Sequence, residues 1–131
     1  MEKKPNRVTK YSIPVILNFV VSDEDIDDIM SAALDGGITY WCGKAEVVGD
    51  YYGEYASEQI SWGGVLKLYD IEDDRVYELT LAKFLMGLRL WIENERVFEL
   101  TDAGRLDVCQ IDAAAADAII QYALFDDITY G

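Results

Sequence analysis

The sequence predicts an α+β fold: a single compact domain in which a mostly antiparallel sheet packs against about three helices. Short runs rich in β-branched and aromatic residues, typical of strands, alternate with longer segments whose apolar residues recur at helical spacing. The chain has 131 residues, of which 51% are hydrophobic. It is therefore long enough for one domain and apolar enough to bury a core.

The beginning of the chain differs in composition from the rest. Residues 1–10 contain four basic residues, one acidic residue and a proline, which predicts a flexible basic arm before a single domain over 11–131. Residues 11–21, YSIPVILNFVV, are rich in β-branched and aromatic residues and predict the first strand. Pro14 favours a place at the edge of the sheet, because proline cannot donate to a central ladder.

Three segments carry the start signals and the periodicity of helices. Ser22 with Asp25 three residues later predicts a capping box, and we expect this helix to end at Gly36 and Gly37. Thr80 and Asp112 are expected to cap helices over 81–94 and 113–125. The residues expected on the buried faces of the first two helices are Ile26, Ile29, Met30, Ala33, Leu34, Leu81, Phe84, Leu85, Leu88, and either Trp91 or Ile92.

Strands fill most of the intervening chain. We expect them at 38–42, extending toward Val48, at 58–62 and 65–69 as a hairpin around Gly63 and Gly64, at 75–80, and at 96–101. Residues 50–58 are compatible with a short helix, since this conformation places Tyr51 with Tyr55 and Glu54 with Glu58 on common faces.

Two repeats occur in the chain. IEDDRVYELT (71–80) and IENERVFELT (92–101) differ only conservatively, and each predicts an acidic turn followed by a strand. A weaker match relates 21–40 to 111–130, and both copies end in Ile-Thr-Tyr. We favour convergence on a common helix–strand unit as the explanation of the second match.

The net charge restricts the classes of partner. The formal charge is −14, and residues 1–10 carry +3, which leaves −17 for the remaining residues. Nucleic acids are bound mainly through Lys and Arg, so this composition disfavours direct nucleic-acid binding and favours a basic protein partner. The alternative is that the acidity serves solubility alone.

Catalytic chemistry and membrane association are not expected. The chain contains no histidine, which removes His-dependent nucleophiles and the commonest metal ligand, so we expect no enzyme, no metal and no cofactor. Calcium loops beginning at Asp23 or Asp70 would need glycine where Asp28 and Arg75 stand. The longest apolar run near the start is too short to span a bilayer, and the two cysteines lack metal or redox spacing. A cytoplasmic location is therefore expected.

Six aromatic residues are interleaved with acids between residues 40 and 62. Tyrosines with exposed polar tips often anchor interfaces, and adjacent acids can pair with basic groups of a partner. We expect Trp41 and Trp62 to pack internally, and Tyr51, Tyr52 and Tyr55 to be available to a partner.

The segments GITYWCGKAEVVGDYYGEYASEQISWGG (37–64) and AIIQYALFDDITYG (118–131) resemble small acidic proteins of phages and conjugative elements of Gram-positive bacteria. Some of those proteins are anti-CRISPR or anti-restriction inhibitors, and several mimic DNA. The resemblance covers the chain from about residue 11 and implies an inhibitor.

The leading hypothesis is a non-catalytic inhibitor that binds the basic nucleic-acid surface of a host defence nuclease, such as a CRISPR or restriction enzyme. The alternative is an adaptor or accessory protein acting through protein contacts, with a homodimer paired through an exposed strand as one form. A carboxylate-based enzyme is the weakest of the three hypotheses. The residues expected to contact a partner are Asp23, Glu24, Asp25, Asp27, Asp28, Asp50, Tyr51, Tyr52, Glu54, Tyr55, Glu58, Asp70, Glu72, Asp73 and Asp74.

Overall fold

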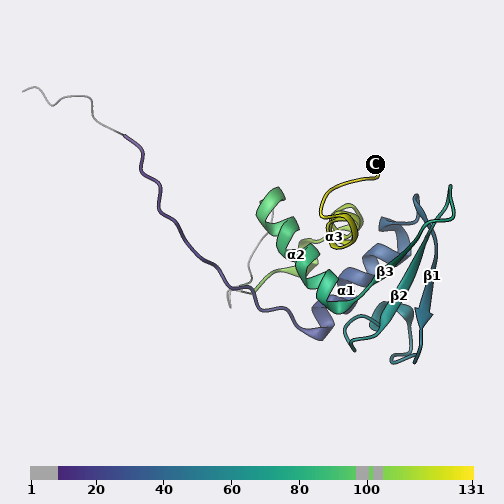
Figure 1. Cartoon of the computed structure of the whole chain (residues 1–131). Coiled ribbons are helices and arrows are strands. Elements are labelled where there is room, and N and C mark those ends of the chain that lie inside the picture. Colours follow the sequence, from purple (N-terminus) through teal and green to yellow (C-terminus); the bar gives the residue numbers. More distant parts are fainter. Residues whose placement is uncertain (1–8, 97–100, 102–104) are drawn as a thin grey trace, which may run out of the picture.

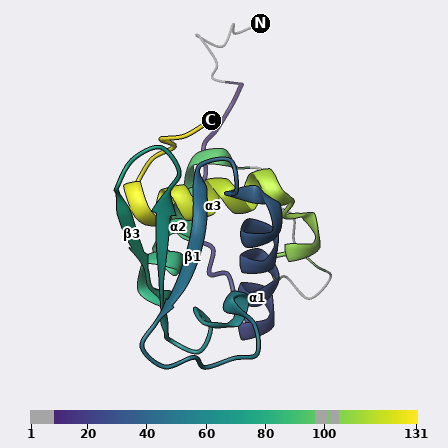
Figure 2. The same ribbon diagram turned by 90° about the vertical axis from the view of Figure 1, so that its right-hand side faces the viewer.

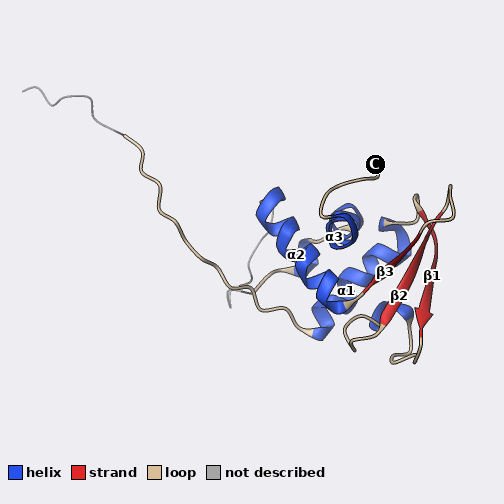
Figure 3. Ribbon diagram, viewed as in Figure 1, coloured by secondary structure: helices blue, strands red, loops and turns tan. Residues whose placement is uncertain are grey.

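The computed structural model describes residues 9–96, 101 and 105–131, and within them it confirms the α+β class (Figure 3). The helices are α1 (Asp23–Ala32), α2 (Leu81–Glu95) and α3 (Ala113–Phe125). The strands β1 (Cys42–Val48), β2 (Val65–Asp70) and β3 (Val76–Leu79) form an antiparallel sheet in the order β1-β2-β3. The short helical segments are η1 (Ala33–Gly37), η2 (Ala56–Glu58) and η3 (Val108–Gln110).

The helices cover one face of the sheet, and the other face is open (Figure 1). On the covered face, the fully buried Leu66 lies opposite Val47 on β1 and Leu79 on β3. On the open face, Glu46 pairs with the Lys44 ammonium at 2.9 Å and accepts a hydrogen bond from the Tyr69 hydroxyl at 3.0 Å. This alternation is typical of an antiparallel sheet with one solvated face.

The predicted helix starts are confirmed. Ser22 Oγ accepts a hydrogen bond from Asp25 N at 3.1 Å, while Ser22 N donates to the Asp25 carboxylate at 3.0 Å, which completes the capping box. Thr80 caps α2 and Asp112 caps α3 in the same way, with a side-chain oxygen accepting from a backbone amide three residues later. These caps were predictable because each contact spans only three residues.

The end of the first helix also agrees with the prediction. After Ala32 the helix widens into the π-helical segment η1, which ends at Gly37. A Cβ atom at Gly37 would lie 2.5 Å from the Ala113 carbonyl oxygen, so only glycine permits this approach to the start of α3. Within the stripes predicted to be buried, Leu85 is 43% exposed, which corrects its assignment, and Leu34 is half-buried.

Several predicted strands are absent. Residues 11–21 have no regular structure, and residues 38–41 form a turn that precedes β1. Glu58 is the last residue of η2 and residues 59–62 form turns, so the predicted hairpin around Gly63 and Gly64 is wrong. Strand β2 pairs instead with β1 and β3. Residues 49–64, which precede β2, form a loop held by hydrogen bonds between its own residues.

The repeated ten-residue phrase takes two structures. Residues 71–74 form the expected turn before β3, whereas residues 92–95 are the last turn of α2, so the second acidic turn is wrong. Of the strand predicted at 96–101, Arg96 is the left-handed cap of α2, with φ 56°, and 97–100 lie outside the described residues. Most of the predicted basic arm, residues 1–8, also lies outside them. Among the described helices, none is both long enough and apolar enough to cross a bilayer.

Candidate functional site

Residues 49–64, which we call the aromatic loop, join the end of β1 to the start of β2, where Val48 pairs with Val65. The loop contains four of the six aromatic residues noted in the sequence, Tyr51, Tyr52, Tyr55 and Trp62. Tyr51, Tyr52 and Tyr55 are exposed, as expected. Trp62 is 64% exposed, which corrects the expectation that it packs internally. Trp62 lies in the turn over 59–63 and not in the predicted strand. Trp41 is buried, as expected.

The backbone of the aromatic loop is held by Gln59, whose side chain is fully buried. Its amide nitrogen donates to the Asp50 carbonyl at 2.9 Å, and its amide oxygen accepts from Tyr52 N at 3.1 Å. A Cβ atom at Gly64 would collide with this amide, which explains a glycine there. Because the loop is fixed before binding, ordering it would add little entropic cost to binding.

Acidic residues surround these rings. The carboxylates of Asp50 and Glu54 are exposed and have no partner among the described residues, whereas Glu58 accepts from Tyr55 N at 3.2 Å. Helix α1 packs against η2, and the start of α1 lies at the same end of the molecule as the aromatic loop (Figures 1 and 2). Asp23, Glu24 and Asp28 are therefore exposed near that end as well.

Two acids of α1 are less available than predicted. Asp25 serves the capping box and binds the Arg105 guanidinium at 2.9 Å. One carboxylate oxygen of Asp27 is shielded from solvent and accepts no hydrogen bond within the described part of the chain. The remaining exposed acids at this end, together with the aromatic loop, form what we call the loop-end surface: Asp23, Glu24, Asp28, Asp50, Tyr51, Tyr52, Glu54, Tyr55 and Trp62.

The predicted acids at 70–74 lie at the opposite end of the sheet, at the end of β2 and in the turn that leads to β3 (Figure 2). Asp70 accepts hydrogen bonds from Glu72 N at 2.7 Å, Asp73 N at 3.2 Å and the Tyr130 hydroxyl. The Tyr130 hydroxyl, followed by these amides, lowers the pKa of Asp70 below its usual value. Asp73 is paired with the Arg75 guanidinium at 3.3 Å. The structure thus divides the predicted site residues between two surfaces.

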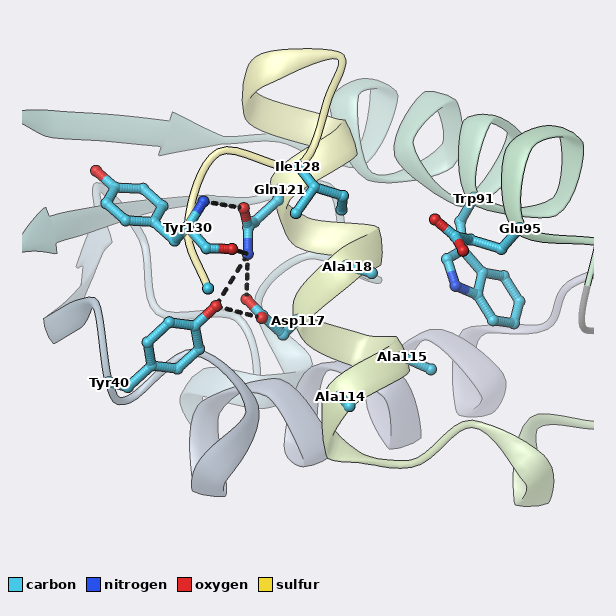
Figure 4. Close-up of a pocket in the computed structure, with 11 residues that line it drawn as sticks. Tyr40, Trp91, Glu95, Ala114, Ala115, Asp117, Ala118, Gln121, Ile128 and Tyr130 are labelled. Atoms are coloured by element: carbon cyan, nitrogen blue, oxygen red, sulfur yellow. Dashed lines mark hydrogen bonds between the residues drawn. The ribbon is translucent and has the colours of Figure 1, made fainter.

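A cleft of about 460 Å³ that sequence reasoning missed lies beside α3, and its lining includes Tyr40, Trp91, Glu95, Asp117, Gln121 and Tyr130 (Figure 4). Asp117 accepts hydrogen bonds from the Tyr40 hydroxyl at 2.7 Å, the Trp41 indole at 2.8 Å and the Gln121 amide at 3.0 Å. Burial and the hydrogen bond to Asp117 raise the pKa of Tyr40 to about 12.

Gln121 joins the other side of this network to the end of the chain. Its amide oxygen accepts from Thr129 N and Tyr130 N, both at 2.7 Å, and it is fully buried. The polar groups of Asp117 and Gln121 therefore have hydrogen-bond partners within this network. The hydrogen bonds of Gln121 clamp residues 129–130 onto α3. The four-residue spacing of Asp117 and Gln121 was the available sequence signal, since such pairs share one helix face.

The two Ile-Thr-Tyr segments meet at this clamp, where Gln121 contacts both Tyr40 and Tyr130. Neither segment is a strand, which corrects the helix–strand unit expected from the weaker repeat. Among the described residues, no group of three or more Cys, Asp or Glu side chains could hold a metal ion.

No protein-family model, curated protein sequence or solved structure matches the chain.

Proposed function

We propose that the protein is a non-catalytic inhibitor that binds the basic nucleic-acid surface of a host defence nuclease, in the manner of a DNA mimic. The observation that supports this most is the loop-end surface. There the carboxylates of Asp50 and Glu54 have no partner among the described residues, and they lie beside exposed tyrosines on a fixed loop. The proposal places the protein in the cytoplasm, where such nucleases act, and its target would be a CRISPR or restriction enzyme.

The physical basis is charge complementarity. A groove that binds phosphates has a strong positive potential, and a protein of net charge −14 is steered toward it. Unpaired carboxylates can then form charge-assisted hydrogen bonds with Arg and Lys, while tyrosine rings supply apolar contact area. Because Asp70 and Asp73 already have internal partners, we assign the main contact to the loop-end surface.

The test begins with capture of nucleases from a lysate of bacteria that carry CRISPR and restriction systems. We expect a nuclease to be retained at about 0.15 M salt and released by DNA or by about 0.5 M salt, since screening increases over this range. The protein should then bind the purified nuclease directly, and DNA should compete with the protein for the nuclease. Retention of a partner that is not a nuclease, unchanged by salt and by DNA, would contradict the proposal.

Two matched variants locate the contact. Asp50→Lys/Glu54→Lys changes the loop-end surface, and Glu72→Lys/Asp74→Lys changes exposed acids at the opposite end. Both change the net charge from −14 to −10, because each substitution adds two charges. The first should weaken binding by roughly tenfold or more, mainly through a slower association rate, and the second should have a much smaller effect. Equal effects would show that net charge alone matters.

The adaptor alternative is favoured by a different observation. Residues 11–20 expose several large apolar side chains, which suit association through apolar area. A partner bound in this way should remain bound when the salt concentration is raised, whereas the inhibitor complex should dissociate.

A further inference from the structure

The aromatic loop combines exposed rings with a negative charge. Tyr51, Tyr52, Tyr55 and Trp62 are each between 47% and 64% exposed, so a large part of every ring is open to a ligand. Residues 49–64 contain three acids and no lysine or arginine, which gives the segment a charge of −3. Aromatic faces beside carboxylates that their own segment does not neutralise suit a flat cation.

The backbone that carries these rings is fixed to the core. Gln59 and Ile60 are both fully buried. The Gly64 amide donates to the Gln59 carbonyl at 2.9 Å, which closes the turn that carries Trp62. A Cβ atom at Gly64 would lie 2.9 Å from a ring carbon of Tyr52, so the Tyr52 ring lies against the same turn. Fixed positions of this kind favour recognition of one chemical group, because little freedom is lost on binding.

Tyr51 lies between two carboxylate residues. Its hydroxyl donates to the Glu54 carbonyl at 3.3 Å, so the ring extends across the loop from Asp50, the preceding residue, toward Glu54. The carboxylates of Asp50 and Glu54 have no partner among the described residues, whereas Glu58 accepts from Tyr55 N. A cation placed over the Tyr51 ring therefore lies close to two residues whose carboxylates can accept its hydrogen bonds.

Arginine suits such a surface better than lysine does. The guanidinium is planar and weakly hydrated, so it can stack on an aromatic ring while its edge donates two parallel hydrogen bonds to a carboxylate. The lysine ammonium is a compact, strongly hydrated charge and gains less from a ring face. Net charge attracts both side chains equally, so the rings and the carboxylate geometry are what distinguish them.

We propose that the loop-end surface selectively binds arginine side chains, with Tyr51 as the ring on which the guanidinium stacks and Asp50 and Glu54 as its acceptors. The partner that fits this surface is a protein segment rich in arginine. The inference rests on the use of the loop-end surface in the proposed function, but it does not require the partner to be a nuclease.

The test uses the full chain and two blocked tetrapeptides of equal charge, one of arginine and one of lysine. Backbone amide chemical shifts, measured by NMR at about 0.15 M salt, give the binding site and the dissociation constant of each peptide. We expect saturable shifts over residues 50–55 and at Trp62. The arginine peptide should bind roughly threefold more tightly or better, since the ring faces favour the guanidinium.

Three variants separate the ring from its hydroxyl. Tyr51→Leu removes the ring, so the two peptides should bind almost equally, mainly through weaker binding of the arginine peptide. Tyr51→Phe keeps the ring and removes the hydrogen bond to Glu54, so the preference for arginine should remain. Tyr11→Leu is the matched control, because Tyr11 is also exposed and lies outside the aromatic loop.

Equal binding of the two peptides by the unmodified chain would overturn the inference, as would a preference that Tyr51→Leu leaves unchanged. Shifts confined to the turn at 71–74 would overturn it as well. A preference for arginine without capture of any nuclease would support the arginine site and reject the nuclease as its target. Capture of a nuclease by a chain that binds both peptides equally would support the proposed function and reject the arginine site.

Discussion

Tyr130 joins three parts of the molecule through one side chain. Its hydroxyl donates to Asp70 at the end of β2 and lies 3.1 Å from the Tyr77 hydroxyl. Its ring stacks on Trp41 with centroids 4.8 Å apart and planes 2° apart. Burial and the hydrogen bond to Asp70 raise the pKa of Tyr130 strongly, so the neutral phenol is the form that the fold uses.

Because of this contact, part of the stability of the folded state is lost at acid pH. The pKa of Asp70 is lowered in the folded state from its ordinary 3.8, so its contribution is present above that value and is lost as the pH falls through the lower folded pKa. Tyr130→Phe keeps the ring but removes the hydroxyl. We expect the pKa of Asp70 to rise in this variant, and the loss of stability in acid to become smaller.

The measurement is an NMR titration of the Asp70 carboxyl carbon, with urea unfolding from about pH 6 to pH 2. Tyr122→Phe is the matched control, because Tyr122 donates its hydroxyl to a different carboxylate, that of Glu95, at 3.0 Å. An unchanged Asp70 titration in Tyr130→Phe would contradict the assignment of this hydroxyl as the main cause.

At the scale of elements, the repeated phrase shows how context overrides local pattern. Immediately before the first copy, the Asp70 carboxylate accepts hydrogen bonds from two backbone amides of the following turn, which stabilises a reversal of the chain before β3. In the second copy, α2 begins at the Thr80 cap and packs Phe84, Leu88 and Trp91 in the core. The helix then continues through Ile92 to Glu95, since extending a helix is easier than starting one.

The close contact between α2 and α3 depends on Gly87. A Cβ atom there would lie 2.5 Å from the Ile119 carbonyl oxygen and 2.6 Å from the Ala123 Cβ. We expect Gly87→Ala to lower the free energy of unfolding by about 1–3 kcal/mol through overpacking, although alanine favours helix. Urea unfolding measures this change.

Gly36→Ala is the control for that prediction, because nothing lies within 4 Å of a Cβ atom at Gly36. This substitution should be neutral or should stabilise the protein by up to about 1 kcal/mol, since it restricts the unfolded chain. Equal effects of the two substitutions would show that the contact between the helices tolerates a methyl group.

At the scale of the whole molecule, exposed acids lie in the connections at both ends of the sheet, and the net charge is −14. Like charges repel one another more in the compact state, so screening should stabilise the fold. We expect the melting temperature to rise by a few degrees when NaCl is increased from about 0.02 to 0.5 M.

The Glu72→Lys/Asp74→Lys variant should show a smaller rise, because its net charge is −10 rather than −14. Thermal unfolding followed by circular dichroism over the same salt series tests both expectations. A melting temperature that falls with salt, or the same rise in both proteins, would show that repulsion between carboxylates does not limit stability.

The sequence by itself determined the α+β class, the starts of the three helices, the strand after residue 75 and the exposure of the three loop tyrosines. These features depend on contacts within a few residues, such as the Ser22–Asp25 box, or on strong periodicity. The acidic character of the surface also followed from composition alone.

Only the tertiary structure decided the rest. Residues 11–21 form no strand although their composition favours one, because strand formation depends on pairing with distant segments, which composition does not reveal. The predicted acids are split between two ends because β2 pairs antiparallel with both β1 and β3, so that the β1–β2 loop and the β2–β3 turn lie at opposite ends of β2. The clamp at Gln121 joins Tyr40 to Tyr130 across 90 residues of chain, and contacts over such separations leave no local pattern to detect.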